Sequence, residues 1–232
     1  MNIVVLIPAR SGSKSLKNKN ILKLKGIPLI AHSIKFARKI PNVKKVFVST
    51  DSKRIKAISK KYNAEVPFLR PKKYSKDNSK DLDVFKHFLK WYRINYKKEI
   101  DLLIHFRPTI PFRSLNVVNS AINLFKKNKN YDSLRSFKQS DFSPYKMWKK
   151  SGNLAKPLFY NEKKEFHSMG RQELPKTYDH IGTIDIMRPK RTIDKNSMVG
   201  NKTFFFLLTD LKKYIDIDKK VDFEIAKKIT FI

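Results

Sequence analysis

With 232 residues, 41% of them hydrophobic and 17 of them Phe, the chain can bury the core of one ordinary domain, and its lack of cysteine excludes disulfides, thiolate metal sites and cysteine nucleophiles. Its 52 Lys and Arg against 20 Asp and Glu give a formal charge of +32, but they are spread over almost every segment without a DNA- or RNA-binding signature, which favours a lysine-rich surface over a nucleic-acid partner. No apolar run approaches the roughly 18 residues of a membrane span, and a strand begins almost at Met1 with no room for a signal peptide, so we expect a cytoplasmic protein without membrane contact.

The first stretch of the chain predicts a ligand site. The apolar, β-branched run from Ile3 to Ile7 predicts a strand buried on both faces, which ends at Pro8. A small, polar and basic loop follows, and it contains Ala9, Arg10, Ser11, Gly12, Ser13, Lys14, Lys17, Lys19 and Asn20. Such a loop places backbone N–H groups and positive charge at the carboxyl edge of a sheet, where phosphates fit. The loop matches neither a Walker A motif nor a dinucleotide GxGxxG motif, and a solvated basic turn is the alternative.

Strand and helix then alternate along the chain. Periodic apolar positions predict helices over 28–40, 54–62, 81–96, 115–127 and 221–229, with Asp51 or Ser52 as the cap of the second. Short apolar runs predict strands over 46–50, 65–69, 101–106, 133–137, 182–187 and 203–207. This alternation predicts an α/β protein with a mostly parallel sheet flanked by helices.

The regular pattern is lost between residues 139 and 178. A turn signal at 151–153 predicts a hairpin that leaves the main sheet. Excursions of this kind often cover an active site or pair two subunits. We find no internal repeat and no low-complexity linker, so the sequence predicts a single domain over 1–232 with an arm inserted at 139–178.

Several blocks carry a family resemblance. The opening IPARSGSKSLKNKN, at residues 7–20, resembles the signature of the acylneuraminate cytidylyltransferases, which make CMP-activated nonulosonic acids. Further blocks resemble the family in the right order: STDS at 49–52, LRP at 69–71, RPTIPFR at 107–113, RQELP at 171–175 and IDIDKKVDFEIA at 215–226. The resemblance covers nearly the whole chain. It implies a Rossmann-like nucleotidyltransferase fold, a hairpin arm used for homodimerisation, CTP as donor and Mg²⁺ as cofactor.

The resemblance also implies a reaction and a nucleotide site. The anomeric hydroxyl of a nine-carbon α-keto acid sugar attacks the α-phosphorus of CTP, and pyrophosphate leaves. Arg10 and Lys14 match the positions that hold the triphosphate, Lys19 matches the one near the α-phosphate, and Arg70 resembles a residue on the cytosine side. The rest of the implied nucleotide loop is Ala9, Ser11, Gly12, Ser13 and Asn20. Displacement at phosphorus builds charge on oxygen atoms, so catalysis depends chiefly on positioning and electrostatic stabilisation.

Asp216 and Asp218 are the candidate metal ligands. Residues i and i+2 of a strand point to the same face, so two carboxylates at this spacing can converge on one hard cation. The alternative is a solvent-facing pair of acids at the end of a strand. The resemblance favours the metal site, and it places these two residues with Arg10, Lys14 and Lys19 in the catalytic set.

The chain departs from the family on the sugar side of the site. Arg107 stands where the family usually has Gln, and Asp179 and Ile181 stand where it usually has Arg and Asn. Together with Thr109 and Arg171, these are the implied sugar-binding residues. A reversed charge and the absence of amide hydrogen bonds argue against N-acetylneuraminic acid as the acceptor. We expect another acidic sugar, such as legionaminic or pseudaminic acid, with Arg107 binding the carboxylate that Asp179 would repel.

Two alternatives remain open. One is a CMP-Kdo-type synthetase or a relative with another acceptor. The other is a polyanion-binding protein on a degenerate nucleotidyltransferase fold, which steep salt dependence of nucleic-acid binding would reveal. The five histidines show no metal-ligand spacing, and only His167 and His180, in or beside the irregular region, are candidates to reach the sugar.

Overall fold

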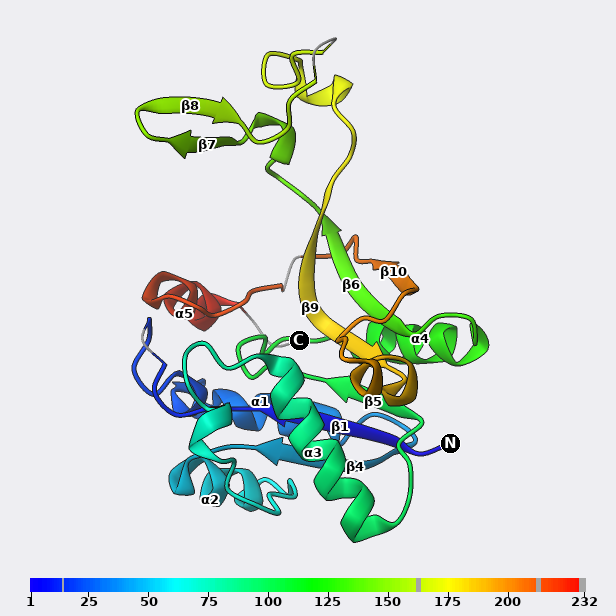
Figure 1. The fold of residues 1–232 in the computed structure, drawn as a ribbon. Helices are drawn as coiled ribbons and strands as arrows, with labels where there is room; N and C mark the ends of the chain where they lie inside the picture. The colour runs from blue at the N-terminus through cyan, green and yellow to red at the C-terminus, as the bar shows by residue number, and fades with distance from the viewer. Residues whose placement is uncertain (14, 162–163, 212–213, 230–232) are drawn as a thin grey trace.

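The computed structural model describes residues 1–13, 15–161, 164–211 and 214–229. Its centre is a six-stranded sheet with the strand order β10-β6-β9-β5-β1-β4 (Figure 1). The strands are β1 (Ile3–Pro8), β4 (Val43–Ser49), β5 (Leu102–His105), β6 (Ser133–Gln139), β9 (Tyr178–Met187) and β10 (Thr203–Leu207). Strand β9 runs antiparallel to both of its neighbours, and the other pairs of this sheet are parallel. The predicted α/β class with a mostly parallel sheet is confirmed.

Helices cover the sheet on both faces. They are α1 (Leu29–Ala37), α2 (Lys53–Lys61), α3 (Asp81–Tyr96), α4 (Leu115–Lys127) and α5 (Lys220–Lys228). Val5 and Ile7 of β1 belong to the core shared with α1, α2 and α4, whereas Val4 and Leu6 belong to the core shared with α3. The first strand is therefore buried on both faces, as its apolar run predicts. A third, smaller core joins α5 to the start of α1 and to the hairpin of β2 (Lys23–Leu24) and β3 (Ile27–Pro28).

Most predicted elements are confirmed, and the limits of α3, α4 and β10 are those expected. Ser52 is the cap of α2, because its Oγ accepts a hydrogen bond from the N–H of Ile55 at 3.2 Å. The predicted strand over 65–69 is wrong: Glu65 makes only an isolated parallel bridge with Phe47. Pro67 has no N–H to continue a ladder beyond that bridge. Among the helices described, none is long and apolar enough to cross a membrane, and the cytoplasmic location stays a prediction.

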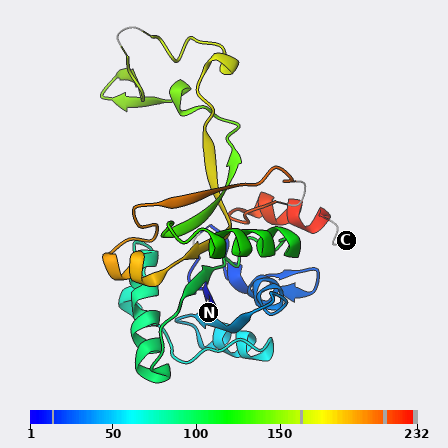
Figure 2. The ribbon, with the colours of Figure 1, turned by 90° about the vertical axis from the view of Figure 1, so that its right-hand side faces the viewer.

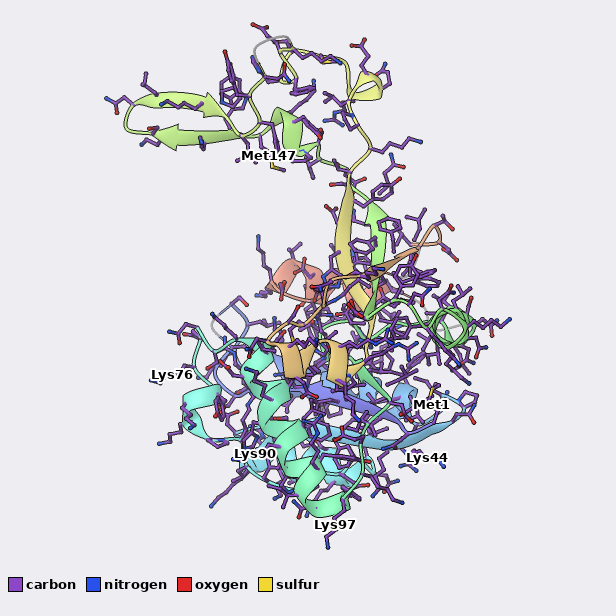
Figure 3. All side chains as sticks on the ribbon, turned by 45° about the vertical axis from the view of Figure 1, so that its right-hand side comes forward. Met1, Lys44, Lys76, Lys90, Lys97 and Met147 are labelled. Carbon is purple, nitrogen blue, oxygen red and sulfur yellow. The ribbon has the colours of Figure 1, made fainter. Side chains whose placement is uncertain are left out.

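The irregular region forms an arm between β6 and β9. It carries the predicted hairpin, β7 (Trp148–Ser151) and β8 (Leu154–Pro157), whose turn includes Gly152 with φ of +59°. The arm stands away from the sheet and helices in two perpendicular views (Figures 1 and 2). Met147, on the arm, lies far from Met1 and Lys44 of the sheet layer (Figure 3).

The arm has almost no core of its own. Of its described residues between 140 and 177, only Leu174 is buried. Its exposed apolar side chains are Phe142, Met147, Trp148, Leu154, Leu158, Phe159 and Tyr160. An apolar surface of this kind, on a segment with little internal packing, is typical of a surface that another molecule covers.

A bulge bends β9 where the arm joins the sheet. Asp185 pairs with Arg135 of β6, but the next paired residue of β9 is His180, opposite Phe137. Residues 181–184 therefore face the single residue Ser136, whose Oγ accepts a hydrogen bond from the N–H of Ile184 at 3.1 Å. Gly182 has a φ of +57° within this bulge. Bulges re-aim the side chains around them, and this one lies beside the end of β5.

Candidate active site

A pocket of about 430 Å³ lies at the carboxyl ends of β1 and β5. The sheet order places β4 on one side of β1 and β5 on the other, so the winding of the chain reverses at this edge. Crevices at such reversals are the usual ligand sites of open α/β sheets. The pocket is lined by Pro8, Arg10, Ser13, Ser15, Lys19, Asn20, Arg70, Tyr74, Lys76, Asp77, Ser79, Asp81, Val84, His105, Arg107, Pro108 and Thr109.

The loop after β1 is folded onto the edge of the sheet. The buried Asn20 donates a hydrogen bond from Nδ2 to the carbonyl of Arg10 at 2.9 Å, which closes the loop. Ser11 donates from its backbone N–H and its Oγ to the two carboxylate oxygens of Asp51, at 2.8 and 2.6 Å. Gly12 has a φ of +68°, a conformation that favours glycine. Lys14 lies outside the described residues.

Positive charge dominates the pocket lining. The cationic lining residues are Arg10, Lys19, Arg70, Lys76 and Arg107, against the two acids Asp77 and Asp81. Arg10 Nη1 pairs with Asp77 Oδ1 at 2.5 Å, and both side chains are partly exposed. A partly exposed ion pair is weak, so a phosphate can replace the carboxylate at little cost.

Arg70 is held rigidly at one side of the pocket. Its backbone N–H donates to the carbonyl of Thr50 at 2.7 Å, and its Nε donates to Ser75 Oγ at 3.1 Å. Burial of the guanidinium lowers the pKa of Arg70, and the charges of Asp51 and Asp81 oppose this shift. The predicted nucleotide residues that line the pocket, Arg10, Ser13, Lys19, Asn20 and Arg70, are thus brought together, and Ser11 and Gly12 lie in the same loop.

The acidic pair meets the cationic loop across the chain. Lys19 Nζ lies 2.7 Å from Asp218 Oδ1, although 199 residues separate the two in sequence. The prediction that Asp216 and Asp218 lie in a strand is wrong, because residues 214–218 form no strand. The segment is instead fixed by the N–H of Ile217, which donates to the carbonyl of Thr109 at 2.8 Å, and by burial of the Ile217 side chain in the small core.

Helix α5 begins directly after the acidic pair. Asp222 Oδ2 accepts hydrogen bonds from the N–H groups of Asp218 and Lys219, at 2.9 and 2.6 Å. Asp222 thereby binds the N–H of the N-cap residue Lys219, as the third residue of a capping box does, and the N–H of the residue before it. The backbone at Asp218 is therefore held by the helix start as well as by the small core.

Asp216 offers a carboxylate oxygen suited to a cation. Its Oδ1 is buried and has no hydrogen-bond partner among the described residues. Burial raises the pKa of Asp216; a hydrogen bond with Thr109 opposes the shift and the charge of Asp218 adds to it. A hard cation such as Mg²⁺ would give Oδ1 a partner and would compensate the negative charges of Asp216 and Asp218. Within the described ranges no cluster of three or more His, Asp or Glu side chains forms a metal cage, so phosphate and water oxygens would complete the coordination.

The predicted sugar-binding residues are divided between two places. Arg107 and Thr109 line the pocket. Asp179 lies at the base of the arm, 3.6 Å from Lys138 Nζ, because the pairing of β9 with β6 carries it away from the pocket. Ile181 is buried in the bulge, and Arg171 lies in the short 3₁₀ helix Arg171–Glu173 of the arm. In the single chain, these last three residues are not part of the pocket wall.

A buried ion cluster behind the pocket was not predicted. Asp185, which is 0% exposed, lies 2.7 Å from Arg107 Nη1, 3.0 Å from Arg135 Nη1 and 2.7 Å from His180 Nε2. Burial alone would raise the pKa of Asp185, but the His180 hydrogen bond and the two arginines hold it below its ordinary value of 3.8. A single acid inside the apolar strand IGTIDIM is the signal that could have indicated this cluster.

Arg113 holds the loop that carries Arg107 and Thr109. Its Nη2 donates to the carbonyl of Arg107 and its Nε to the carbonyl of Thr183, both at 2.9 Å. Its guanidinium carbon lies 4.4 Å from the ring centroid of Phe106. Burial and then the charge of Arg107 lower the pKa of Arg113 to about 9, so the side chain is still charged at neutral pH.

The chain is similar in sequence to known cytidylyltransferases. A family model described as cytidylyltransferase matches residues 4–229. The CMP-N,N'-diacetyllegionaminic acid synthase of Legionella pneumophila is 32% identical over 99% of this chain and 96% of its own length. The N-acylneuraminate cytidylyltransferase of Escherichia coli is 29% identical over 97% of this chain and 51% of its own length.

A solved structure supports the fold. A CMP:2-keto-3-deoxy-manno-octonic acid synthetase, solved in complex with CTP, superposes with a TM-score of 0.67 at 18% identity, covering 98% of this chain and 97% of its own. The likeness at this level of identity concerns the fold, and it confirms the predicted nucleotidyltransferase architecture.

The Asp185 cluster predicts a pH-dependent stability. Asp185→Asn leaves the buried Arg135 and the partly buried Arg107 without their anion, and should lower the free energy of unfolding by about 3–5 kcal/mol at neutral pH. The pKa of Asp185 is lowered in the fold, so its contribution is complete above its ordinary value of 3.8 and is lost as the pH falls through the folded value. The difference in the free energy of unfolding between wild type and variant should therefore become smaller below about pH 4. Urea unfolding in a descending pH series measures it; equal stabilities at neutral pH would contradict the prediction.

Proposed function

The chain belongs to the cytidylyltransferase family, and from this premise we propose that it transfers CMP from CTP to the anomeric hydroxyl of an acidic nine-carbon sugar. The sugar oxygen forms a bond to the α-phosphorus, the bond from that phosphorus to the β-phosphate oxygen breaks, and pyrophosphate leaves while the hydroxyl proton is released. The contact between Lys19 and Asp218 carries the proposal, because it joins the acidic segment to a lysine of the cationic loop that lines the pocket.

The cationic loop would bind and stabilise the triphosphate. Arg10 and Lys19 line the pocket, where they can take up the negative charge that develops on the phosphate oxygens. Arg70 and Tyr74 line another part of the wall, and they are the groups that we assign to the cytosine side. Lys14 belongs to the same proposed set by its sequence position.

Asp216 and Asp218 would hold Mg²⁺. A bound Mg²⁺ would neutralise charge on the triphosphate and on the leaving pyrophosphate. The candidate metal-binding atoms are Oδ1 of Asp216, which has no hydrogen-bond partner among the described residues, and the mostly exposed carboxylate oxygens of Asp218. Lys19 is the present partner of Asp218, and its ammonium would turn to a phosphate oxygen when the carboxylate takes the metal.

The acceptor is proposed to be a nonulosonic acid such as legionaminic or pseudaminic acid. The names of the Legionella and Escherichia relatives both denote acidic sugars as substrates or products. Arg107 lines the pocket with a side chain that is 24% exposed, and it is the residue that we assign to the sugar carboxylate. Thr109 lines the pocket beside it.

A second copy of the chain is proposed to cover the arm. The exposed apolar side chains of 142–160 would be buried in a homodimer, and Arg171 would then be available to the pocket of the partner. This arrangement would give Arg171 the sugar-side role that the single chain does not allow.

Pyrophosphate release tests the reaction. The chain should release pyrophosphate from CTP, with Mg²⁺ and a nonulosonic acid, and should not do so from ATP, GTP or UTP or without the sugar. The octonic acid named for the solved relative belongs in the panel, because preference for it would establish the Kdo-type alternative. No release with CTP and any acidic sugar would rule out the proposed function.

Asp218→Asn tests the metal site. The variant should keep the wild-type thermal unfolding, because the Asp218 side chain is 65% exposed, while Mg²⁺-dependent turnover should fall by roughly 100-fold or more. Glu224→Gln is the matched control and should behave like wild type, because Glu224 is an exposed acid on α5 whose one ion pair with a described residue is that with Lys227. Full turnover of Asp218→Asn across a Mg²⁺ titration would show that this carboxylate does not serve the metal.

Removal of the arm tests the dimer. Ser140 N–H donates to the carbonyl of Thr177 at 2.8 Å, so residues 141–176 can be replaced by an Asn-Gly turn that joins β6 to β9. The full chain should sediment as a dimer and the shortened chain as a folded monomer, since Leu174 is the one buried residue among those of the arm that the structure describes. A full chain that sediments as a monomer would contradict the proposal.

A further inference from the structure

Asp185 lies behind the pocket wall and has no part in the reaction as proposed. It is 0% exposed, so no substrate touches it, but its Oδ2 lies 2.7 Å from Nη1 of Arg107. Arg107 is 24% exposed and lines the pocket. The buried carboxylate therefore contacts the pocket through one side chain that a ligand can reach.

The contact leaves one edge of the Arg107 guanidinium available. Nη1 donates to Asp185 Oδ2 and, at 3.3 Å, to the carbonyl of Gly182. Nε and Nη2 make no hydrogen bond to any residue that the structure describes. These two nitrogens form one of the paired edges with which arginine binds a carboxylate in bidentate fashion.

The charges of the cluster do not cancel. Asp185 contributes one negative charge, and Arg107 and Arg135 contribute two positive charges. Arg135 is directed elsewhere: its Nη2 donates to the carbonyl of Met198 at 3.1 Å, and it does not line the pocket. The excess positive charge therefore reaches the pocket at Arg107, where it favours an anionic group.

The bulge of β9 fixes the same guanidinium from a second side. A Cβ built on Gly182 would lie 2.2 Å from Arg107 Nη1, so only glycine leaves room for the side chain. Gly182 and Asp185 belong to one strand, and Arg107 follows β5. The position of Arg107 thus depends on how β9 bends beside the end of β5.

We infer that Asp185 is a positioning residue of the acceptor site: it holds Arg107 so that the Nε–Nη2 edge binds the carboxylate of the acidic sugar. It thereby sets the preference for an acidic acceptor over the same sugar with its carboxylate masked. The inference rests on the proposed function and names the group of the substrate that this wall of the pocket recognises.

A double-mutant cycle tests the inference. Steady-state kinetics are measured for wild type, Arg107→Ala, Asp185→Asn and the double variant, with the best acidic acceptor from the panel and with its methyl ester. Each single variant should raise KM for the acid by roughly 10- to 100-fold and leave KM for CTP and for the ester nearly unchanged. The double variant should match Arg107→Ala alone, because Asp185 acts through Arg107.

Further variants separate positioning from loss of folding. Gly182→Ala keeps every charge of the cluster but displaces Arg107, and should raise KM for the acid while the ester is unaffected. Gly26→Ala is the matched control, because Gly26 has a φ of +77° and nothing within 4 Å of a built Cβ; its kinetics should be those of wild type. Asp132→Asn, a carboxylate at the far end of β6 that accepts from the N–H of Asn201, controls for the loss of a partly buried acid and should leave KM for the acid unchanged.

The outcomes are distinguishable. A wild-type chain that turns over no acidic sugar with CTP overturns the proposed function and the inference together. An active wild type with unchanged KM in Gly182→Ala and in folded Asp185→Asn overturns the inference alone. So does a double variant whose KM rises well above that of Arg107→Ala, since Asp185 would then act independently of Arg107.

Discussion

The site depends on apolar packing that brings the first loop of the chain to the segment before the last helix, where Lys19 and Asp218 form an ion pair. Neither segment belongs to the main sheet. Each is instead attached to the small core in which Leu24 and Leu29 meet Ile217 and Phe223. Burial of this apolar cluster brings the carboxyl-terminal segment beside the pocket. The hydrogen bond from the N–H of Ile217 to the carbonyl of Thr109 then fixes the segment against the loop that lines the pocket. The charged groups then meet at an edge that hydrophobic packing has already defined.

Two carboxylates, Asp185 and the partly buried Asp216, show how differently the fold treats acidic groups. Asp185 is surrounded by two arginines and a histidine, which lower its pKa, so it is a compensated structural anion. Asp216 has an oxygen that no described residue contacts through a hydrogen bond, another acid lies nearby, and its pKa is raised. Interiors that tolerate a poorly compensated charge usually do so where a ligand supplies the compensation. This contrast separates a residue that supports the pocket from one that is proposed to bind a ligand.

The sequence predicted well those features that depend on local pattern. The 3.6-residue period of α3 and α4, the apolar run of β1 and the turn at Gly152 all specify their structures within a few residues. The failures have physical causes: Pro67 interrupts what otherwise resembles a strand, and residues 214–218 gain their order from Ile217 and a distant carbonyl, not from a ladder. The family resemblance assigns Lys19 and Asp218 to one site, and the fold brings the two side chains into contact.

The Asp185 cluster could not be predicted in the same way. Its members come from the end of β5, from β6 and from both sides of a bulge in β9. The order of strands in the sheet brings them together, and no local sequence pattern predicts that order. The same holds for Asp179, because only the register of β6 and β9 shows that it lies at the base of the arm. Pairing between strands that are distant in sequence sets the positions of such residues, and the local pattern of a single sequence does not reveal that pairing.

The arm is inserted between two adjacent paired strands, and the pairing of Ser140 with Thr177 closes it at its base. The pairing of β6 with β9 therefore does not depend on the length or the sequence of the arm. Insertions closed by a hairpin stem are tolerated because few core contacts cross their boundary. Such an architecture is modular: the arm can change in length or sequence while the sheet and its helices keep their fold.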